Sequence, residues 1–221
     1  MLKIQTPHRE SEHEADALAL FDGDGAARLL ARDREEHALL IERCVPGTPL
    51  SEAGQDVALD VFVDLLPRLW KPAGLPFRQL AEEAAWWAEY LPRQAWTMAP
   101  EVLAAALEAL AELPSTQGES VLLNQDLHAE NVLAAQREPW LVIDPKPLAG
   151  EREFGVAPIV RSFELGHSKR DVLYRFDRLT SDLGLDRERA RGWTIAQTAA
   201  WSWESHYNAR HVETARWLLE G

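Results

Sequence analysis

Two short apolar runs in the second half of the chain end in polar residues, and this arrangement constrains the fold more than any other feature. The first run, 121–123, leads into the segment NQDLHAENVL, and the second, 140–143, leads into Asp144. Short apolar runs bounded by turn residues are typical of strands. Two strands joined by a tight excursion would bring Asp126, Asn131 and Asp144 together, whereas unconnected runs would leave them as turn and cap residues.

Residues of these types suit phosphoryl transfer from ATP. That reaction needs a carboxylate to accept the proton of a hydroxyl group, and oxygen ligands for the magnesium ions that bridge the phosphates. Asp126 is the candidate base, and Asn131 and Asp144 are the candidate metal ligands. By spacing alone, the pattern favours this chemistry no more than it favours ordinary turns, because an aspartate and an asparagine five residues apart often occur by chance.

The segment PGTP at 46–49 divides the chain. Before it, the pattern predicts a short strand at 2–4, a helix within 9–21, and a hairpin of the runs 28–31 and 38–43. After it, strands are expected only at 121–123, 131–135 and 140–143. Helices are expected at 55–70, 77–90, 100–113, 156–165 and 169–183, and as a pair within 187–219. We therefore expect a small domain at 1–46 and a mainly helical domain at 47–221.

Charge and cysteine content narrow the class of protein. Thirty-six acidic and 23 basic residues give a formal net charge of −13, which opposes binding to nucleic acid or to an anionic membrane and favours a cationic small molecule as partner. A single cysteine, Cys44, excludes an intramolecular disulfide and is interpreted as a small packed residue on a strand. No basic leader and no apolar stretch of roughly 18 residues is present, so we expect a cytoplasmic protein.

The polar segments also resemble those of a known family. NQDLHAENVL is similar to the catalytic loop of aminoglycoside phosphotransferases. WLVIDPKPL, at 140–148, resembles the metal-binding segment of the aminoglycoside and hydroxyurea resistance kinases, which include streptomycin 6-phosphotransferases, and its Asp-Pro-Lys sequence is the most specific sign. The resemblance implies an α+β, protein-kinase-like fold with a mainly helical C-terminal lobe. Because the chain begins at the lysine strand of that family, it also implies a truncated N-terminal lobe without the glycine-rich loop.

The resemblance implies roles for individual residues. It makes Asp126 the catalytic base, and Asn131 and Asp144 the ligands of Mg²⁺. Lys3 matches the strand lysine that contacts the ATP phosphates, and Glu14 matches its partner on the following helix. Without the resemblance, both would be interpreted as surface charges.

Further residues are implied for the adenine and the acceptor. The backbone between Glu42 and Cys44 matches the connection between the lobes that hydrogen-bonds adenine. Trp201 and Glu204 lie three residues apart on a predicted helix, in the region that lines the acceptor site of related kinases. Their alternative interpretation is a core tryptophan and a solvated acid.

Two departures from the family concern the support of the catalytic loop. Asn124 and Gln125 stand where the family has His-Gly, so a glycine is missing from a tight turn. Gly155 stands where the family has an aspartate that ties the loop down through its backbone. His128 is expected to brace the site. We therefore expect the reactive residues to be present but less firmly held.

The predicted function is ATP-dependent phosphorylation of a hydroxyl group of an aminoglycoside such as streptomycin. The alternatives are a degenerate or truncated kinase-like protein without activity, a kinase of hydroxyurea or another small alcohol, and a non-catalytic helical protein that binds a partner through its tryptophan-rich C-terminal region. Dependence of ATP binding on magnesium separates the kinases from the last of these. The sequence does not predict the oligomeric state.

Overall fold

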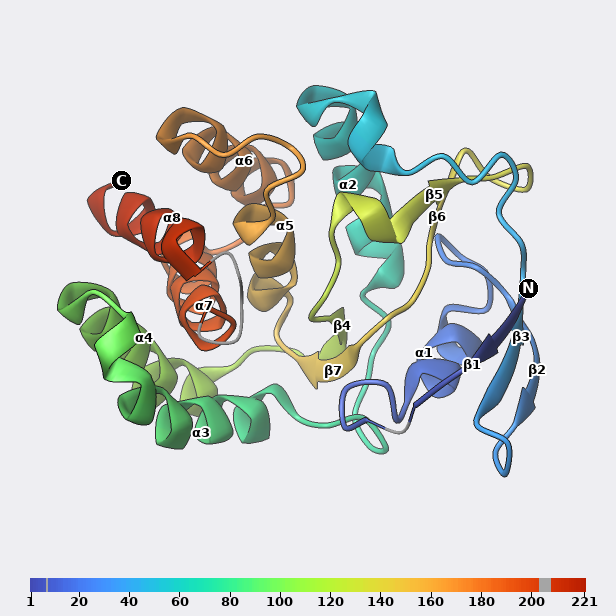
Figure 1. The fold of residues 1–221 in the computed structure, drawn as a ribbon, viewed down its shortest axis with the longest axis horizontal. Coiled ribbons are helices and arrows are strands. Elements are labelled where there is room, and N and C mark those ends of the chain that lie inside the picture. Colours follow the sequence, from blue (N-terminus) through green and yellow to red (C-terminus); the bar gives the residue numbers. More distant parts are fainter. Residues whose placement is uncertain (7, 203–207) are drawn as a thin grey trace.

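The computed structural model describes residues 1–6, 8–202 and 208–221. Figure 1 shows a small layer of strands with one helix beside a larger helical part, and two strand pairs lie between them. The strands are β1 Leu2–Ile4, β2 Leu29–Asp33, β3 Ala38–Ile41, β4 Val121–Asn124, β5 Val132–Ala134, β6 Trp140–Val142 and β7 Pro147–Gly150. The α-helices are α1 Glu14–Phe21, α2 Gln55–Leu69, α3 Leu80–Tyr90, α4 Pro100–Glu112, α5 Ala157–Arg161, α6 Lys169–Asp182, α7 Arg187–Ala200 and α8 Asn208–Glu220.

The N-terminal sheet has the strand order β1-β3-β2, and both pairings are antiparallel. Lys3 lies opposite Leu39 in the register, so β1 carries its lysine beside the middle of the sheet. Helix α1 packs on one face of the sheet and shares a small buried cluster with it, made of Ala15, Leu18, Ala27, Leu39 and Ile41. Some α1 residues, such as Phe21, belong instead to the large core, and the predicted boundary at residue 46 stays a prediction.

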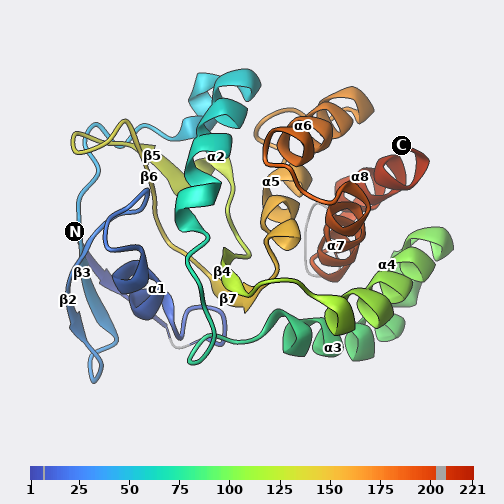
Figure 2. The same cartoon turned by 180° about the vertical axis from the view of Figure 1, so that it is seen from behind.

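Two antiparallel strand pairs stand between this sheet and the helices. β4 pairs with β7, and β5 pairs with β6, as both views show (Figures 1 and 2). The strands predicted at 121–123, 131–135 and 140–143 are confirmed, while β7 was not predicted. Its first and last residues, Pro147 and Gly150, are typical of turns. Gly150 is required by packing, because a Cβ there would lie 2.5 Å from the Cβ of Leu80.

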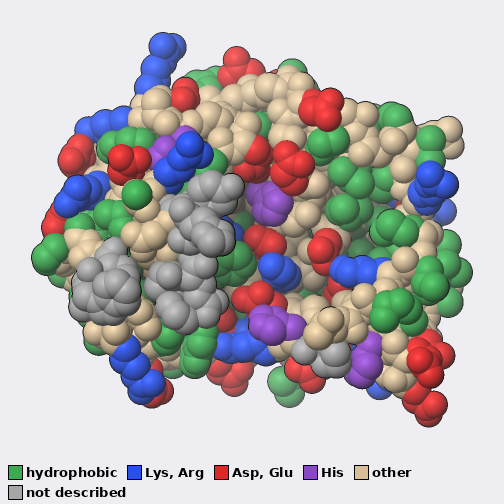
Figure 3. All heavy atoms as spheres, in the orientation of Figure 1, with side chains coloured by type: hydrophobic (Ala, Val, Ile, Leu, Met, Phe, Trp, Pro, Cys, Tyr) green, Lys and Arg blue, Asp and Glu red, His purple; other side chains and the backbone are tan. Residues whose placement is uncertain are grey.

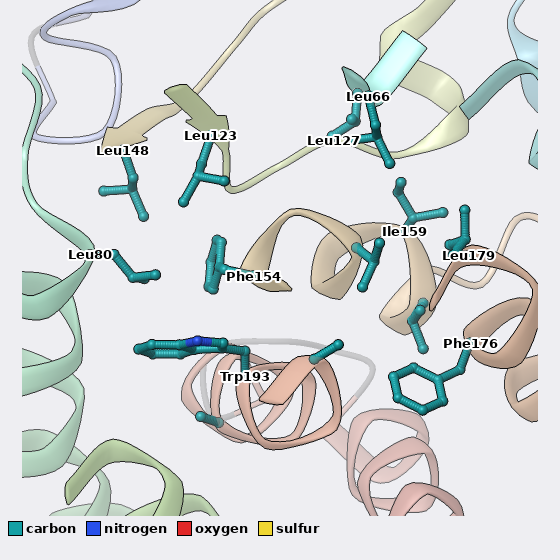
Figure 4. Close-up of a cluster of buried hydrophobic side chains, with 14 of the residues drawn as sticks. Leu66, Leu80, Leu123, Leu127, Leu148, Phe154, Ile159, Phe176, Leu179 and Trp193 are labelled. Atoms are coloured by element: carbon teal, nitrogen blue, oxygen red, sulfur yellow. The ribbon is translucent and has the colours of Figure 1, made fainter. Parts of the chain in front are cut away.

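The helical part is built around one large apolar core (Figure 4). Phe154 lies at its centre, with ring centroids 6.1 Å from Trp87 of α3 and 5.9 Å from Trp193 of α7. Most of α7 is buried, because α4, α5 and α8 pack against it. Aromatic side chains of this size dominate the free energy gained on burial, so this cluster fixes the helices that carry the site.

Most helix predictions are confirmed, with shifts at the ends. Helix α1 begins at Glu14 rather than Arg9, and the helix predicted at 156–165 is only α5, preceded by the 3₁₀ turn Arg152–Val156. The segment 187–219 does contain two helices, and Asp186 caps the first by accepting from two backbone N–H groups. None of the helices in the described ranges is long and apolar enough to span a membrane.

Candidate functional site

Two loops face each other in the middle of the molecule, one joining β4 to β5 and the other joining β6 to β7. Because β4 pairs with β7 and β5 pairs with β6, the ends of one loop are fixed against the ends of the other. Backbone hydrogen bonds also join the loops directly: the Gln125 N–H donates to the Lys146 carbonyl (3.0 Å), and the Ile143 N–H donates to the Asn131 carbonyl (2.9 Å). Asp144 directly follows Ile143, so it lies next to a residue that is hydrogen-bonded to the first loop.

Two buried amide side chains brace the first loop. Asn124 accepts, through Oδ1, the backbone N–H groups of Asp126 (3.1 Å) and Lys146 (3.0 Å), and so ties the two loops together. Gln197 of α7 donates from Nε2 to the Gln125 carbonyl (2.8 Å). Buried hydrogen bonds of this kind hold a loop in one conformation, because breaking them leaves polar groups unpaired away from water.

The aspartate that the resemblance led us to expect at position 155 has no space here. Gly155 is buried, and a Cβ at this position would lie 2.9 Å from Nε1 of Trp70. The tie to the backbone of the loop comes instead from Gln197, on a different helix. Other side chains therefore brace the loop here, and the expectation of a less firmly held loop stays a prediction.

Asp126 is enclosed by two cations. Its Oδ2 lies 2.7 Å from Nζ of Lys146, and its Oδ1 lies 3.3 Å from Nη2 of Arg161. Arg161 stacks on the ring of Trp201, with its Cζ 4.1 Å from the ring centroid. Burial lowers the pKa of the Arg161 guanidinium, and the carboxylate of Asp126 opposes that shift.

Asn131 is oriented by the loop itself. Its Nδ2 donates to the Asp126 carbonyl (3.0 Å) and lies 3.2 Å from Nε2 of His128. An amide nitrogen can only donate, so Nε2 of His128 is the acceptor in this arrangement and Oδ1 of Asn131 stays available. Glu164 accepts the Ala129 N–H (2.8 Å) and lies 3.8 Å from Nδ1 of His128, so His128 lies as a brace between the loop and the following segment.

Lys3, Glu14 and Asp144 meet across the junction of the two parts of the molecule. Nζ of Lys3 lies 2.8 Å and 2.7 Å from the two carboxylate oxygens of Glu14, which is fully buried, and it also binds Asp144. Burial lowers the pKa of Lys3, but the hydrogen bonds to Asp144 and Glu14 outweigh burial and hold that pKa above its ordinary value. The lysine therefore stays charged at neutral pH.

A magnesium ion fits the donor atoms at this place. Asn131 offers an amide oxygen and Asp144 offers carboxylate oxygens, the hard ligands that Mg²⁺ prefers. Asp144 adopts φ of 50°, in the left-handed region that aspartate and asparagine tolerate better than most residues. In the described ranges, no three His, Cys, Asp or Glu side chains form a metal-binding group, so a metal here would depend on the asparagine and on phosphate oxygens.

The segment after β3 is held by its own side chains. The Glu42 carboxylate accepts from Nε (3.0 Å) and Nη2 (2.9 Å) of Arg137 and from the Arg28 N–H (3.0 Å). The hydrogen bond from Arg137 is the largest cause of a lowered Glu42 pKa.

Cys44 was predicted on a strand, which is wrong, because β3 ends at Ile41 and Cys44 follows it half-buried. Burial raises its pKa, which disfavours the reactive thiolate.

A cavity of about 440 Å³ opens beside Asp126. Figure 3 shows the corresponding face, where acidic, basic and histidine side chains gather around a hollow in the middle. The described lining includes Glu10, Trp86, Asp126, Glu130, Arg161, Glu164 and Trp201. Trp201 therefore lies at this cavity, its role in binding an acceptor stays a prediction, and Glu204 falls outside the described residues.

Sequence reasoning missed several residues of this lining. Glu10 comes from the segment before α1, Arg161 from the end of α5, and Glu164 from the loop that follows α5. No local pattern marks them, because only the packing of distant segments brings them together. Trp86 carried a partial signal: it is adjacent to Trp87, so both could not be buried in the same way, and it is 45% exposed while Trp87 is 1% exposed.

Comparisons with known proteins agree with this geometry. A family model described as aminoglycoside/hydroxyurea antibiotic resistance kinase matches residues 1–206. The chain is 42% identical to a hydroxyurea phosphotransferase of Kitasatospora aureofaciens, over 99% of this chain and 67% of that protein. It is 40% identical to a streptomycin 6-kinase of Streptomyces griseus, over 94% of this chain and 72% of that protein.

Solved structures show the same fold. A choline kinase, LicA of Streptococcus pneumoniae, superimposes with a TM-score of 0.70 at 14% identity, over all of this chain and 85% of that one. An aminoglycoside phosphotransferase, APH(4)-Ia, superimposes with a TM-score of 0.57 at 15% identity, over 95% of this chain and 82% of that one. The predicted protein-kinase-like α+β fold is confirmed.

Proposed function

Because this chain belongs to the aminoglycoside/hydroxyurea antibiotic resistance kinase family, we propose that it transfers the γ-phosphoryl group of ATP to a hydroxyl group of an aminoglycoside such as streptomycin. The observation that supports the proposal most is the pair of loops, joined by backbone hydrogen bonds, that carries Asp126, Asn131 and Asp144, with Asp144 in contact with Lys3. Phosphoryl transfer needs those groups in that combination.

In the proposed reaction, each side chain has one task. Asp126 accepts the proton of the acceptor hydroxyl as its oxygen forms a bond to the γ-phosphorus, and the bond from that phosphorus to the bridging oxygen breaks to leave ADP. Lys3 binds the non-transferred phosphates and is held in place by Glu14. Asn131 and Asp144 would hold Mg²⁺, which when bound neutralises charge on the β- and γ-phosphate oxygens. The backbone from Glu42 to Cys44 would bind adenine.

The cavity supports a cationic acceptor. Its described lining residues include the acidic Glu10, Asp126, Glu130 and Glu164, and the basic ones are Arg161, His128 and His211. Trp86 and Trp201 add aromatic edges to the wall, while their ring faces are stacked by Arg9 (4.4 Å) and Arg161 (4.1 Å). Glu204 is the further carboxylate proposed for the acceptor. The requirement for ATP places the proposed reaction in the cytoplasm.

Hydroxyurea is the second candidate acceptor, because a relative of that name is 42% identical to this chain. It is an uncharged molecule of a few atoms, whereas a cavity of about 440 Å³ has the size typical of sites for larger ligands. Size and charge together favour the aminoglycoside.

The test is ATP-dependent phosphate transfer by the purified chain to streptomycin and to hydroxyurea, with magnesium present. We expect transfer to streptomycin, and a decrease in kcat of about 100-fold or more for Asp126→Asn, since a general base contributes about that much. Asp64→Asn is the matched control, because this aspartate is exposed on α2 and pairs only loosely with Arg68.

Three outcomes discriminate among the candidates. A wild-type rate equal to that of Asp126→Asn would show a kinase-like protein without activity. Transfer to hydroxyurea alone would assign the chain to the second candidate. ATP binding that does not depend on magnesium would favour a non-catalytic binding protein.

A further inference from the structure

Lys146 follows the proposed metal ligand by two positions, yet its side chain reaches the proposed base. Its backbone is fixed on both sides, since its N–H donates to Asn124 and its carbonyl accepts from Gln125. Its Nζ lies 2.7 Å from Oδ2 of Asp126. The position of Lys146 is therefore built into the junction of the two loops.

The two cations on Asp126 differ in their freedom to move. Arg161 is buried and stacked on Trp201 at 4.1 Å, so its guanidinium is fixed. The Lys146 side chain is 29% exposed, and its ammonium has two further favourable neighbours, Glu10 at 3.8 Å and the Trp201 ring at 5.4 Å. A flexible ammonium with several partners can exchange one for another at small cost, because an ammonium is a point charge without fixed geometry.

The γ-phosphoryl group must pass close to this ammonium. A hydroxyl that gives its proton to Asp126 lies within hydrogen-bond distance of that carboxylate, and the phosphorus it attacks lies next to it. Phosphoryl oxygens and the Asp126 carboxylate are both negative, so a cation between them is required to offset their repulsion. Lys3 has another task in the proposed reaction, because it lies on Glu14 and Asp144 and binds the non-transferred phosphates.

We propose that Lys146 is a catalytic residue, whose ammonium moves from Asp126 to the γ-phosphoryl oxygens when ATP binds and stays on them during transfer. The inference rests on the proposed function. The bond from the γ-phosphorus to the bridging oxygen breaks and leaves its electron pair on ADP, the acceptor oxygen bonds to phosphorus, and the hydroxyl proton passes to Asp126. Lys146 keeps its proton throughout, and Arg161 stays on Asp126 as its positioning partner.

The kinetic test compares Lys146→Met with Lys169→Met. We expect Lys146→Met to lower kcat by about 100- to 1000-fold, as the loss of one transition-state donor does, with the KM for acceptor changed less than threefold. Lys146→Arg should recover part of the rate, because it restores the charge. Lys169 is exposed on α6 and bonded to Glu220, so Lys169→Met should keep the wild-type rate.

The binding test needs no turnover and compares ADP with AMP-PNP, which carries a γ-phosphoryl group. We expect Lys146→Met to bind ADP as the wild type does, which also shows that the variant is folded, and to lose about tenfold in affinity for AMP-PNP. Lys3→Met should weaken both nucleotides together. If Lys146→Met does not fold, Lys146→Gln replaces it.

The outcomes separate this inference from the proposed function. A wild type that transfers phosphate to neither acceptor overturns the proposed function, while the binding contrast still tests Lys146. Unchanged AMP-PNP affinity in Lys146→Met overturns the inference, even if kcat falls, because the ammonium would then act on Asp126 alone. A kcat within threefold of the wild-type value overturns it as well.

Discussion

The two ends of the proposed site are built in different ways. At the base end, Asp126 and Lys146 are fixed by backbone hydrogen bonds to the side chain of Asn124, which is only 7% exposed. At the lysine end, Lys3 reaches Asp144 through side chains alone, across 141 positions of sequence, and the Asp144 side chain is 47% exposed. The backbone of the base end is therefore preorganised, whereas the contact between Lys3 and Asp144 depends on side chains alone.

The largest expected effect is on kcat. It tests whether the lysine end is needed for phosphoryl transfer but contributes little to the free energy of unfolding. Asp144→Asn keeps the shape and the tolerance for positive φ but removes the charge that would hold magnesium. We expect kcat to fall by about 100- to 1000-fold, which is about 3 to 4 kcal/mol of activation free energy. The free energy of unfolding should change by less than about 1 kcal/mol, as is usual for an exposed ion pair.

Steady-state kinetics and urea unfolding of the same preparation measure both quantities. A large loss of stability would show that the two ends are equally structural, and the contrast between them would disappear.

A smaller effect, on the free energy of unfolding, is expected when the side chain of Asn124 at the base end is removed. Asn124→Ala leaves the N–H groups of Asp126 and Lys146 without their acceptor, so the free energy of unfolding should fall by about 2 kcal/mol. Urea unfolding measures this loss. Asn208→Ala is the control, since among the described residues its Nδ2 donates to the Ser202 carbonyl at 3.2 Å, near the start of α8 and outside the two loops. Equal effects of the two substitutions would argue against a special role for Asn124.

The smallest effect concerns Glu42, which joins the N-terminal sheet to the β5–β6 hairpin through Arg137. Its pKa is lowered below 4.5 in the folded protein, so its contribution to stability is present above pH 4.5 and is lost as the pH falls through the folded pKa. The difference in Tm between wild type and Glu42→Gln should be constant from neutral pH down to the ordinary pKa of a glutamate, and it should shrink as the pH falls further, through the lowered folded pKa. We expect the Glu42–Arg137 pair to contribute less than about 1 kcal/mol to the free energy of unfolding. A Tm difference that grows in acid would contradict a lowered pKa of Glu42.

The sequence predicted the parts of the fold that depend on local pattern. Helices α2, α4, α6 and α7 begin where expected, because their apolar spacing and terminal signals agree. Strand β7 was missed because its sequence, PLAG, is typical of a turn and its pairing with β4 is set by a segment more than twenty residues away. Local patterns carry no information on such pairings.

The site shows the same division. Asp126, Asn131 and Asp144 were found because short strands bring them together, and Lys3 and Glu14 because the family resemblance supplied them. Arg161 and Gln197 were not found, since each reaches the loop from a helix whose own sequence gives no sign of it. The weak support expected from Gln125 and Gly155 stays a prediction, because residues elsewhere in the chain also hydrogen-bond the loop.

The separate origins of the cavity walls have a consequence for how this protein can change. The proposed reacting groups lie on two loops, whereas much of the wall around the acceptor comes from the segment before α1, from α3 and from the ends of α5 and α7. Substitutions such as Trp86→Leu or Glu10→Gln can therefore reshape the range of acceptors while the loops keep their hydrogen bonds. The acceptors that the proposed site takes can therefore diversify at one set of positions while the groups proposed for phosphoryl transfer are kept at another.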